Sequence, residues 1–120
     1  MEAFQISLPI SRELHSHNKG HWRTKVGVVR SARELAMLEA IQHGRRLKGK
    51  VGVFYRFKVP DNRRRDEANL IQSCKPYIDG VVDSGKIQGD HWQALGTQGV
   101  SVEIVPGLFE VELLFQELSK

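Results

Sequence analysis

Alternating apolar and polar residues predict two strands in the first half of the chain. Every second residue from Phe4 to Leu8 is apolar, so we expect residues 3–9 to form a strand with one buried face. The same period of two recurs over residues 51–58. Pro60 follows shortly afterwards, and because proline cannot donate to a strand ladder, we expect it to end the second strand.

Two other segments have apolar residues at intervals of three and four, which predicts helices. The first covers residues 28–43 and indicates an amphipathic helix that ends near Gly44. The second covers residues 70–82, and Gly85 is the expected end of its helix. Pro76 lies inside this second helix, and it either kinks the helix or marks where the regular part begins.

The remaining part of the chain again alternates, over residues 99–105 and 108–117. Pro106 and Gly107 separate these segments, so the pattern predicts a terminal β-hairpin. The resulting order is strand, helix, strand, helix, strand, strand. Because 120 residues are too few for two domains of ordinary size, we expect a single α+β domain over residues 1–120, with two helices packed on a small mixed sheet.

The charge of the chain favours an anionic partner. Lys and Arg number 18 against 14 Asp and Glu, which gives a formal net charge of +4. Basic residues gather in residues 11–26, a stretch without periodicity that we expect to be a long basic loop, and in the connector 45–50. Trp22 in that loop is either a stacking residue for an unpaired base or an anchor of the loop, and Trp92 is expected to pack under the site.

The cysteine content and the first ten residues bear on the cellular compartment of the protein. Cys74 is the single cysteine, so neither an internal disulfide nor a cysteine-based zinc site is expected, and a reducing cytoplasm fits best. The first ten residues contain no long apolar run, which predicts neither a signal peptide nor a membrane span.

Four carboxylates surround the second predicted helix, namely Asp66, Asp79, Asp83 and Asp90. On a continuous helix, one face within roughly 80° of arc would hold Ala68, Gln72, Lys75, Asp79 and Asp83. By itself such a stripe is an ordinary solvated face with a surface ion pair, and for Asp83 we keep that interpretation. An arginine run directly before Asp66 favours a different interpretation, a metal-dependent nuclease site. Paired carboxylates hold magnesium, and arginines hold the phosphodiester by its oxygens.

These residues resemble a known signature. The stretch Arg64-Arg65-Asp66-Glu67-Ala68-Asn69-Leu70, then Lys75-Pro76-Tyr77-Ile78-Asp79-Gly80, then Gly85 and Asp90-His91, resembles the RusA family of crossover junction endodeoxyribonucleases of prophages and bacteria. The likeness extends to the first strand, the basic loop and the predicted hairpin. It implies a RusA-like fold and carboxylates that bind Mg²⁺, with Mn²⁺ as a substitute, for hydrolysis of DNA phosphodiesters.

Position by position, the resemblance implies metal ligands at Asp66, Asp79 and Asp90, and a catalytic role for the same three residues and for Lys75 near the scissile phosphate. Ala68 departs from the pattern, because it stands where the family has a second Asp. The interval from Ala68 to Lys75 is also longer than in the short form of the family, although it returns to the same helix face. His91 either replaces the missing ligand, assists proton transfer or is a bystander.

The expected function is therefore resolution of four-way DNA junctions by paired, symmetric nicks, which a homodimer would supply by symmetry. DNA contacts are expected from Lys19, Arg23, Arg45, Arg46, Arg63, Arg64, Arg65 and Asn69. The salt-sensitive part of the affinity is expected from Arg45, Arg46, Arg63, Arg64 and Lys75. Two alternatives stay open: a junction-binding protein that has lost cleavage through Ala68, and a generic nucleic-acid-binding α+β domain whose carboxylates are surface charges.

Overall fold

The computed structural model describes the backbone of residues 2–10 and 22–118, and the side chains of residues 2–10 and 26–118. Its elements, in chain order, are β1 (Ala3–Pro9), α2 (Trp22–His43), β2 (Val51–Val59), α3 (Glu67–Ser73), α4 (Lys75–Asp83), β3 (Leu95–Ile104) and β4 (Glu110–Glu117). The predicted α+β class and order are confirmed, with the second predicted helix divided into α3 and α4. No helix in the described part of the chain is long and apolar enough to cross a membrane.

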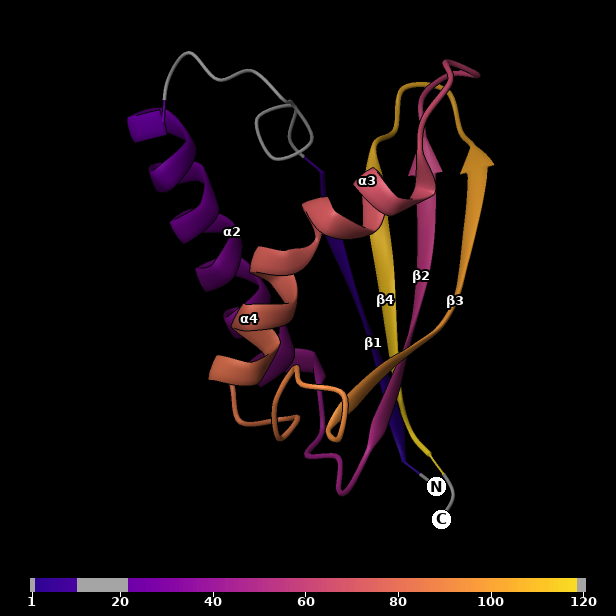
Figure 1. Cartoon of the computed structure of the whole chain (residues 1–120). Coiled ribbons are helices and arrows are strands. Elements are labelled where there is room, and N and C mark those ends of the chain that lie inside the picture. The colour runs from indigo at the N-terminus through magenta and orange to yellow at the C-terminus, as the bar shows by residue number, and fades with distance from the viewer. Residues whose placement is uncertain (1, 11–21, 119–120) are drawn as a thin grey trace.

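The four strands form one mixed sheet in the order β1-β4-β2-β3 (Figure 1). β4 is antiparallel to both of its neighbours, and β2 is parallel to β3. The predicted terminal hairpin is therefore wrong, because β4 leaves β3, passes β2 and inserts next to β1. Burial explains the choice: Val111, Leu113 and Phe115 of β4 are completely buried and need a strand on each side, whereas β3 ends in the exposed Val102 and Ile104.

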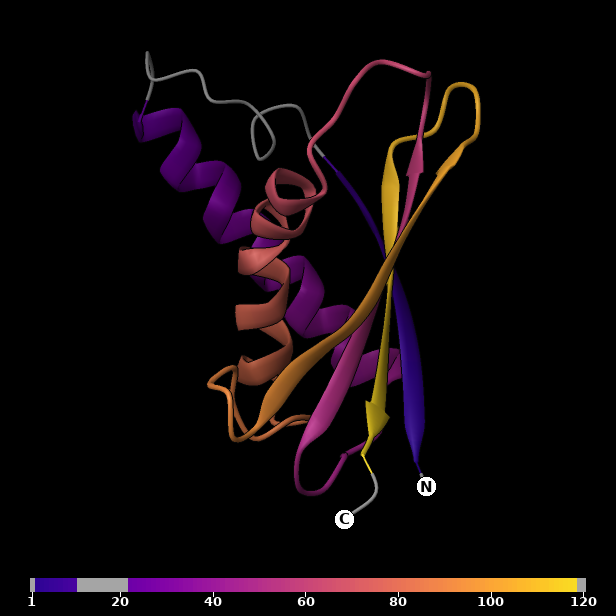
Figure 2. The ribbon, with the colours of Figure 1, turned by 45° about the vertical axis from the view of Figure 1, so that its right-hand side comes forward.

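The helices cover a single face of this sheet (Figure 2). The inward residues of β1, β2 and β4, including Leu8, Phe57 and Phe115, form the core together with buried residues of α2, α3 and α4. On the other face, the nearly buried carboxylate of Glu112 accepts from Lys58 at 2.6 Å and from Arg56 at 3.2 Å. The hydrogen bond from Lys58 lowers the pKa of Glu112, so the charged form of this carboxylate is favoured in the folded sheet.

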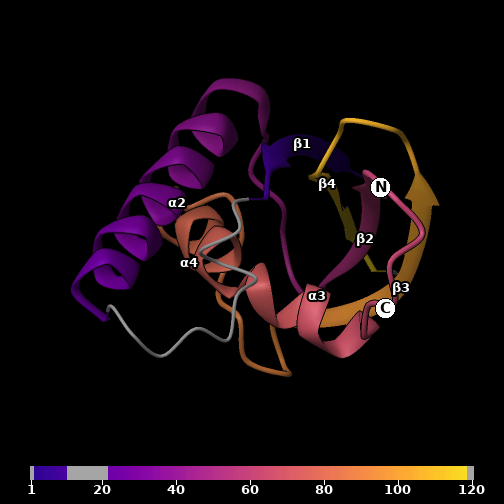
Figure 3. The ribbon, with the colours of Figure 1, turned by 90° about the horizontal axis from the view of Figure 1, so that it is seen from above.

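Helices α2 and α4 pack against each other at very short range (Figure 3). At Gly80 an added Cβ would lie 2.1 Å from the Arg33 carbonyl oxygen and 2.9 Å from the Ala36 Cβ, so the two helix backbones are in direct contact there. A bidentate ion pair reinforces this contact: Arg33 Nε and Nη2 lie 2.5 and 2.8 Å from the two carboxylate oxygens of Asp83. The position of α4, which carries part of the candidate site, is thus set by α2.

The helices begin and end partly at other residues than the sequence predicts. α2 begins at Trp22, so the prediction of a loop is wrong for residues 22–26; residues 11–21, with Lys19, lie outside the described residues. Pro76 marks the start of a separate helix and does not kink a continuous one. Cys74 separates α3 from α4, and Pro76 stands in the first turn of α4, where its missing N–H has no intrahelical partner to lose. Gly85, with φ of 78°, follows the end of α4 as expected.

Candidate active site

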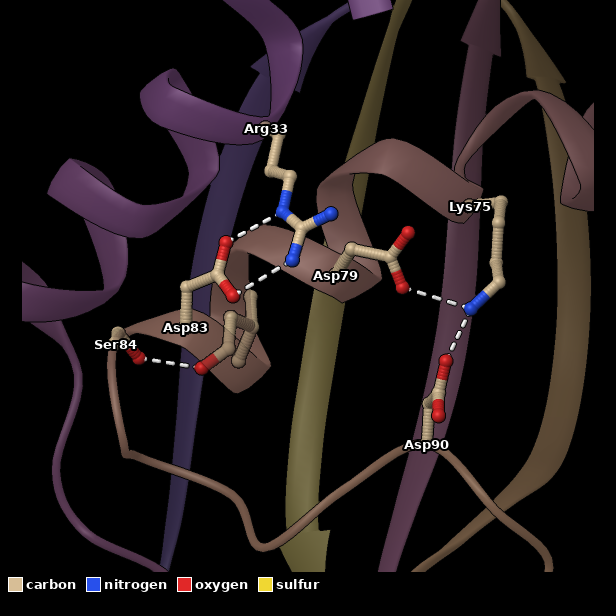
Figure 4. Close-up of polar contacts among 7 residues, drawn as sticks. Arg33, Lys75, Asp79, Asp83, Ser84 and Asp90 are labelled. Carbon is tan, nitrogen blue, oxygen red and sulfur yellow. Dashed lines mark hydrogen bonds and ion pairs between the residues drawn. The ribbon is translucent and has the colours of Figure 1, made fainter. Parts of the chain in front are cut away.

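Lys75 joins the two carboxylates that matter most for the predicted chemistry (Figure 4). Its ammonium nitrogen donates to Asp79 Oδ1 at 2.7 Å and also to Asp90 Oδ2. Lys75 and Asp79 are one turn apart on α4, whereas Asp90 comes from the segment that joins α4 to β3. The Asp79 and Asp90 side chains are 28% and 40% exposed, so both carboxylates are open to solvent and to a ligand.

The segment that carries Asp90 is held in place by hydrogen bonds to the body. Leu47 donates its backbone N–H to the Lys86 carbonyl at 2.8 Å, and Val51 donates to the Ala94 carbonyl at 2.9 Å. The carbonyl of His91 accepts from Ala94 and from the following residue at 2.9 Å, which closes a turn. These hydrogen bonds therefore hold the segment with Asp90 in place beside Lys75.

Electrostatics favour the charged forms of Lys75 and Asp90. Hydrogen bonds to Asp79 and Asp90 raise the pKa of Lys75, and the bond from Lys75 lowers the pKa of Asp90. At neutral pH the cluster contains one ammonium and two carboxylates, with an excess negative charge. An excess of this sign attracts a further cation.

Arg33 and Asp83 extend the cluster into a row of alternating charge, in which Asp79 lies between the Arg33 guanidinium and the Lys75 ammonium (Figure 4). The pair with Arg33 lowers the pKa of Asp83. Asp83 is therefore more than the solvated surface carboxylate expected from the sequence. Its partner was missed because Arg33 lies 50 residues earlier, on a different helix.

Asp66 is placed elsewhere. It is the N-cap of α3, and its Oδ1 accepts from the backbone N–H of Ala68 at 2.9 Å. The seven residues of α3 rise roughly 10 Å between this cap and the helix break before Lys75. The structure thus unites Lys75, Asp79 and Asp90 but sets Asp66 at the opposite end of a helix. The continuous polar face predicted from Ala68 onward is broken at Cys74.

The arginine run has two different parts. Arg65 folds inward, where its Nη1 donates to the carbonyls of Asp61 and Arg63 at 3.0 Å and its Nη2 lies 3.0 Å from Asp61 Oδ1. Only 10% of the Arg65 side chain is exposed, and its guanidinium lies 5.5 Å from the Phe109 ring centroid. Arg65 thus shapes the turn, while Arg63 and Arg64 are exposed to solvent.

The other predicted DNA contacts differ in exposure. Arg45 is exposed and paired with Glu2 at 2.5 Å, and Arg46 is exposed. Asn69 is half-buried on α3, and the side chain of Arg23 lies outside the described residues. The prediction that Trp92 packs under the site is wrong, because Trp92 is one of the most exposed apolar side chains of the described chain.

Two open pockets lie along β3, on the face that carries the helices. The first has a volume of about 440 Å³ and is lined by Lys75 and Asp90 together with Gln72 of α3 and residues 95–97 at the start of β3. The second, of about 310 Å³, is lined by Arg63, the turn around it, and Val102 and Ile104 near the end of β3. Positions 96 and 103, the midpoints of the two lining segments of β3, are seven residues apart, and a strand rises about 3.3 Å per residue, so the pockets are on the order of 20 Å apart.

The carboxylates of Asp79 and Asp90 could supply part of the ligands of a hard cation. Among the described residues, no group of three or more His, Cys, Asp or Glu side chains is arranged to hold a metal ion. Asp79 and Asp90 nevertheless converge on one cation, the Lys75 ammonium. Mg²⁺ commonly binds one or two carboxylates and completes its shell with water and phosphate oxygens. These two carboxylates therefore fit a hydrated magnesium ion without Asp66.

Comparison with known proteins adds no assignment. No protein-family model matches the chain, and a search of curated proteins finds no match either.

Replacing Lys75 with Ala should raise the pKa of Asp90, because the ammonium that stabilises its charged form is removed. Since the Asp90 pKa is lowered in the folded protein, the stability from this contact is present above the ordinary aspartate pKa and is lost as the pH falls through the folded value. NMR titration of the Asp90 carboxyl carbon measures the shift. Arg33→Gln is the control: it should shift the titration of Asp83 and leave Asp90 near its wild-type value. An unchanged Asp90 titration in Lys75→Ala would contradict the ion pair.

Proposed function

We propose that the protein is a magnesium-dependent, structure-specific DNA endonuclease that resolves four-way junctions by paired nicks in recombination and repair. The observation that supports this most is the convergence of Asp79 and Asp90 on Lys75, with Lys75 and Asp90 lining an open pocket, at positions where the sequence resembles the RusA signature. The generic nucleic-acid-binding alternative gives no reason for two carboxylates and an ammonium to meet at the edge of a pocket.

The two pockets along β3 define a path for a DNA strand. Arg63 would hold one phosphate at the second pocket, and Lys75 would meet another at the first. Because the two pockets are separated along β3, these contacts would fall on different phosphates of the strand. The scissile phosphate would therefore lie at Lys75, with the neighbouring phosphates anchored by the arginines.

Each side chain has a role in this proposal. Asp79 and Asp90 would hold Mg²⁺, which supplies positive charge to the phosphate and activates water for attack on phosphorus. Lys75 would exchange a carboxylate for a phosphate oxygen and stabilise the charge that develops there during displacement. Asp66 would act at one remove, because it caps α3 and so fixes the helix that precedes Lys75.

Paired nicks on opposite strands require two such sites, and a homodimer related by a twofold axis would provide them. The second candidate function is structure-selective junction binding without cleavage. Ala68 in place of a carboxylate favours it, as does the position of Asp66 at the opposite end of α3 from the cluster.

The test uses a synthetic mobile four-way junction and a linear duplex of matched sequence, each incubated with the purified protein in Mg²⁺, in Mn²⁺ or in EDTA. Paired, metal-dependent nicks on the junction alone support the proposal. Tight junction binding without nicks in either metal supports the second candidate. Equal binding to junction and duplex, again without nicks, contradicts both and leaves the generic domain.

A further inference from the structure

Trp92 is the most conspicuous side chain that the proposed chemistry does not use. It is 76% exposed, which is unusual for the largest apolar side chain, and it comes two residues after Asp90. A tryptophan here contributes nothing to the core. Its ring is therefore available to a ligand that approaches the cluster of Lys75, Asp79 and Asp90.

The backbone beneath Trp92 is fixed rather than free to fold the ring inward. The carbonyl of His91 accepts the N–H groups of Ala94 and Leu95 at 2.9 Å, so Trp92 lies inside a closed turn. The His91 ring packs near the buried Gly89, where an added Cβ would lie 3.1 Å from it. Because this turn is joined to β2 through Ala94, the ring is presented on a rigid base.

One basic side chain, that of Lys50, lies over the ring, and further basic residues lie in the neighbouring connector. The Lys50 ammonium lies 6.0 Å from its centroid, at the outer range of a cation–π contact. The connector before β2, which also carries the exposed Arg46 and Lys48, is hydrogen-bonded to the Trp92 segment through the Lys86 carbonyl. Within the described chain, Arg46, Lys48, Lys50 and Lys86 form no ion pair with a carboxylate.

We propose that Trp92 is a stacking platform for an unpaired nucleobase, with Lys50 holding the phosphate next to that base. An aromatic face with the unpaired Lys50 ammonium beside it matches a single-stranded nucleotide, which offers a π face and a negative charge. An apolar protein surface or an acyl chain would leave the Lys50 ammonium without a counter-charge. The inference deepens the proposed function, on which its place in the reaction rests: the strand that leaves the cluster at Asp90 would carry the splayed base.

Binding is measured in EDTA, so that no cleavage is needed. The probes are a short labelled oligothymidylate and the same oligonucleotide with abasic sites in place of its bases, followed by anisotropy at low salt. Wild type should bind the oligothymidylate more tightly than the abasic strand. Trp92→Ala should weaken oligothymidylate binding about fivefold or more and leave abasic binding unchanged, because stacking is lost while the cations remain.

Further variants separate the effect of aromatic stacking from the effect of a large apolar side chain. Trp92→Phe should retain most of the affinity, whereas Trp92→Leu, which is apolar without a π face, should behave like Trp92→Ala. Lys50→Gln should weaken both probes, since it removes a phosphate contact. In a Trp22→Phe background, quenching of the remaining tryptophan by oligothymidylate reports contact with Trp92 directly.

Three results would overturn the inference: full affinity in Trp92→Ala, full affinity in Trp92→Leu, or Trp92 fluorescence that responds to protein concentration and not to the oligonucleotide, which would indicate self-association. The proposed nuclease function fails separately. Absence of nicking with intact Trp92-dependent binding contradicts the nuclease and keeps the platform, and normal junction nicking and DNA binding by Trp92→Ala contradict the platform alone.

Discussion

Asp90→Asn is expected to lower the rate of magnesium-dependent junction nicking by about 100-fold or more. Asparagine keeps the shape of the side chain but removes the charge that Lys75 contacts and that the proposed divalent cation would share. Only Asp79 would then face the cation, and one carboxylate holds magnesium weakly. Junction affinity in EDTA should be unchanged or slightly higher, because a negative charge near the DNA has been removed. The measurement is single-turnover cleavage of the mobile junction with excess enzyme.

Asp83→Asn provides the matched control for this experiment. It is the same substitution in the same row of charges, but Asp83 pairs with Arg33, whereas Lys75 pairs with Asp79 and Asp90. We expect a small loss of stability and nicking within about threefold of wild type. If Asp90→Asn and Asp83→Asn lose activity equally, the row of charges acts through folding, and the assignment of Asp90 to the metal is wrong.

Gly80→Ala is expected to lower the free energy of unfolding by about 3 kcal/mol. The new methyl group would lie 2.1 Å from the Arg33 carbonyl oxygen, and this neighbour is helix backbone rather than a flexible side chain. Relief of the overlap requires α4 to move away from α2, which also strains the Arg33 ion pair with Asp83. Chemical denaturation with far-UV circular dichroism gives the free energy of unfolding.

Gly27→Ala is the same substitution in open surroundings. Gly27 lies in α2, and an added Cβ meets no atom of the described chain within 4 Å. This variant should gain about 0.5–1 kcal/mol, because alanine has the higher helix propensity. Equal stabilities for the two variants would show that α2 and α4 do not pack as closely as described.

The elements were predictable from periodicity, but their pairing was not. Alternation identified the strand around Val111, yet the turn residues Pro106 and Gly107 pointed to a hairpin that does not exist. The useful clue was composition: Leu113, Leu114 and Phe115 are consecutive apolar residues typical of a central strand, whereas β3 contains glycines and polar residues typical of an edge. The start of α2 was missed because residues 22–27 include a glycine and lack regular apolar spacing.

The sequence predicts only those contacts of the candidate site that are local in the chain. Lys75 and Asp79 are four residues apart on one helix, so their contact follows from local geometry. Asp90 joins them only because tertiary contacts hold its loop, and Arg33 reaches Asp83 only because α2 and α4 cross at Gly80. Distances that depend on packing between elements leave no periodic trace in one sequence.

The place of β4 in the sheet also bears on how the chain is made. β1 pairs with β4 alone, and β4 is the last of the described strands to leave the ribosome. Until it emerges, the apolar residues of β1 have no sheet neighbour and one edge of β2 is open. Translation proceeds at about 5–20 residues per second, so these surfaces stay exposed for seconds. The sheet closes only once β4 has emerged, which makes the nascent chain a candidate client for chaperones that bind extended apolar segments.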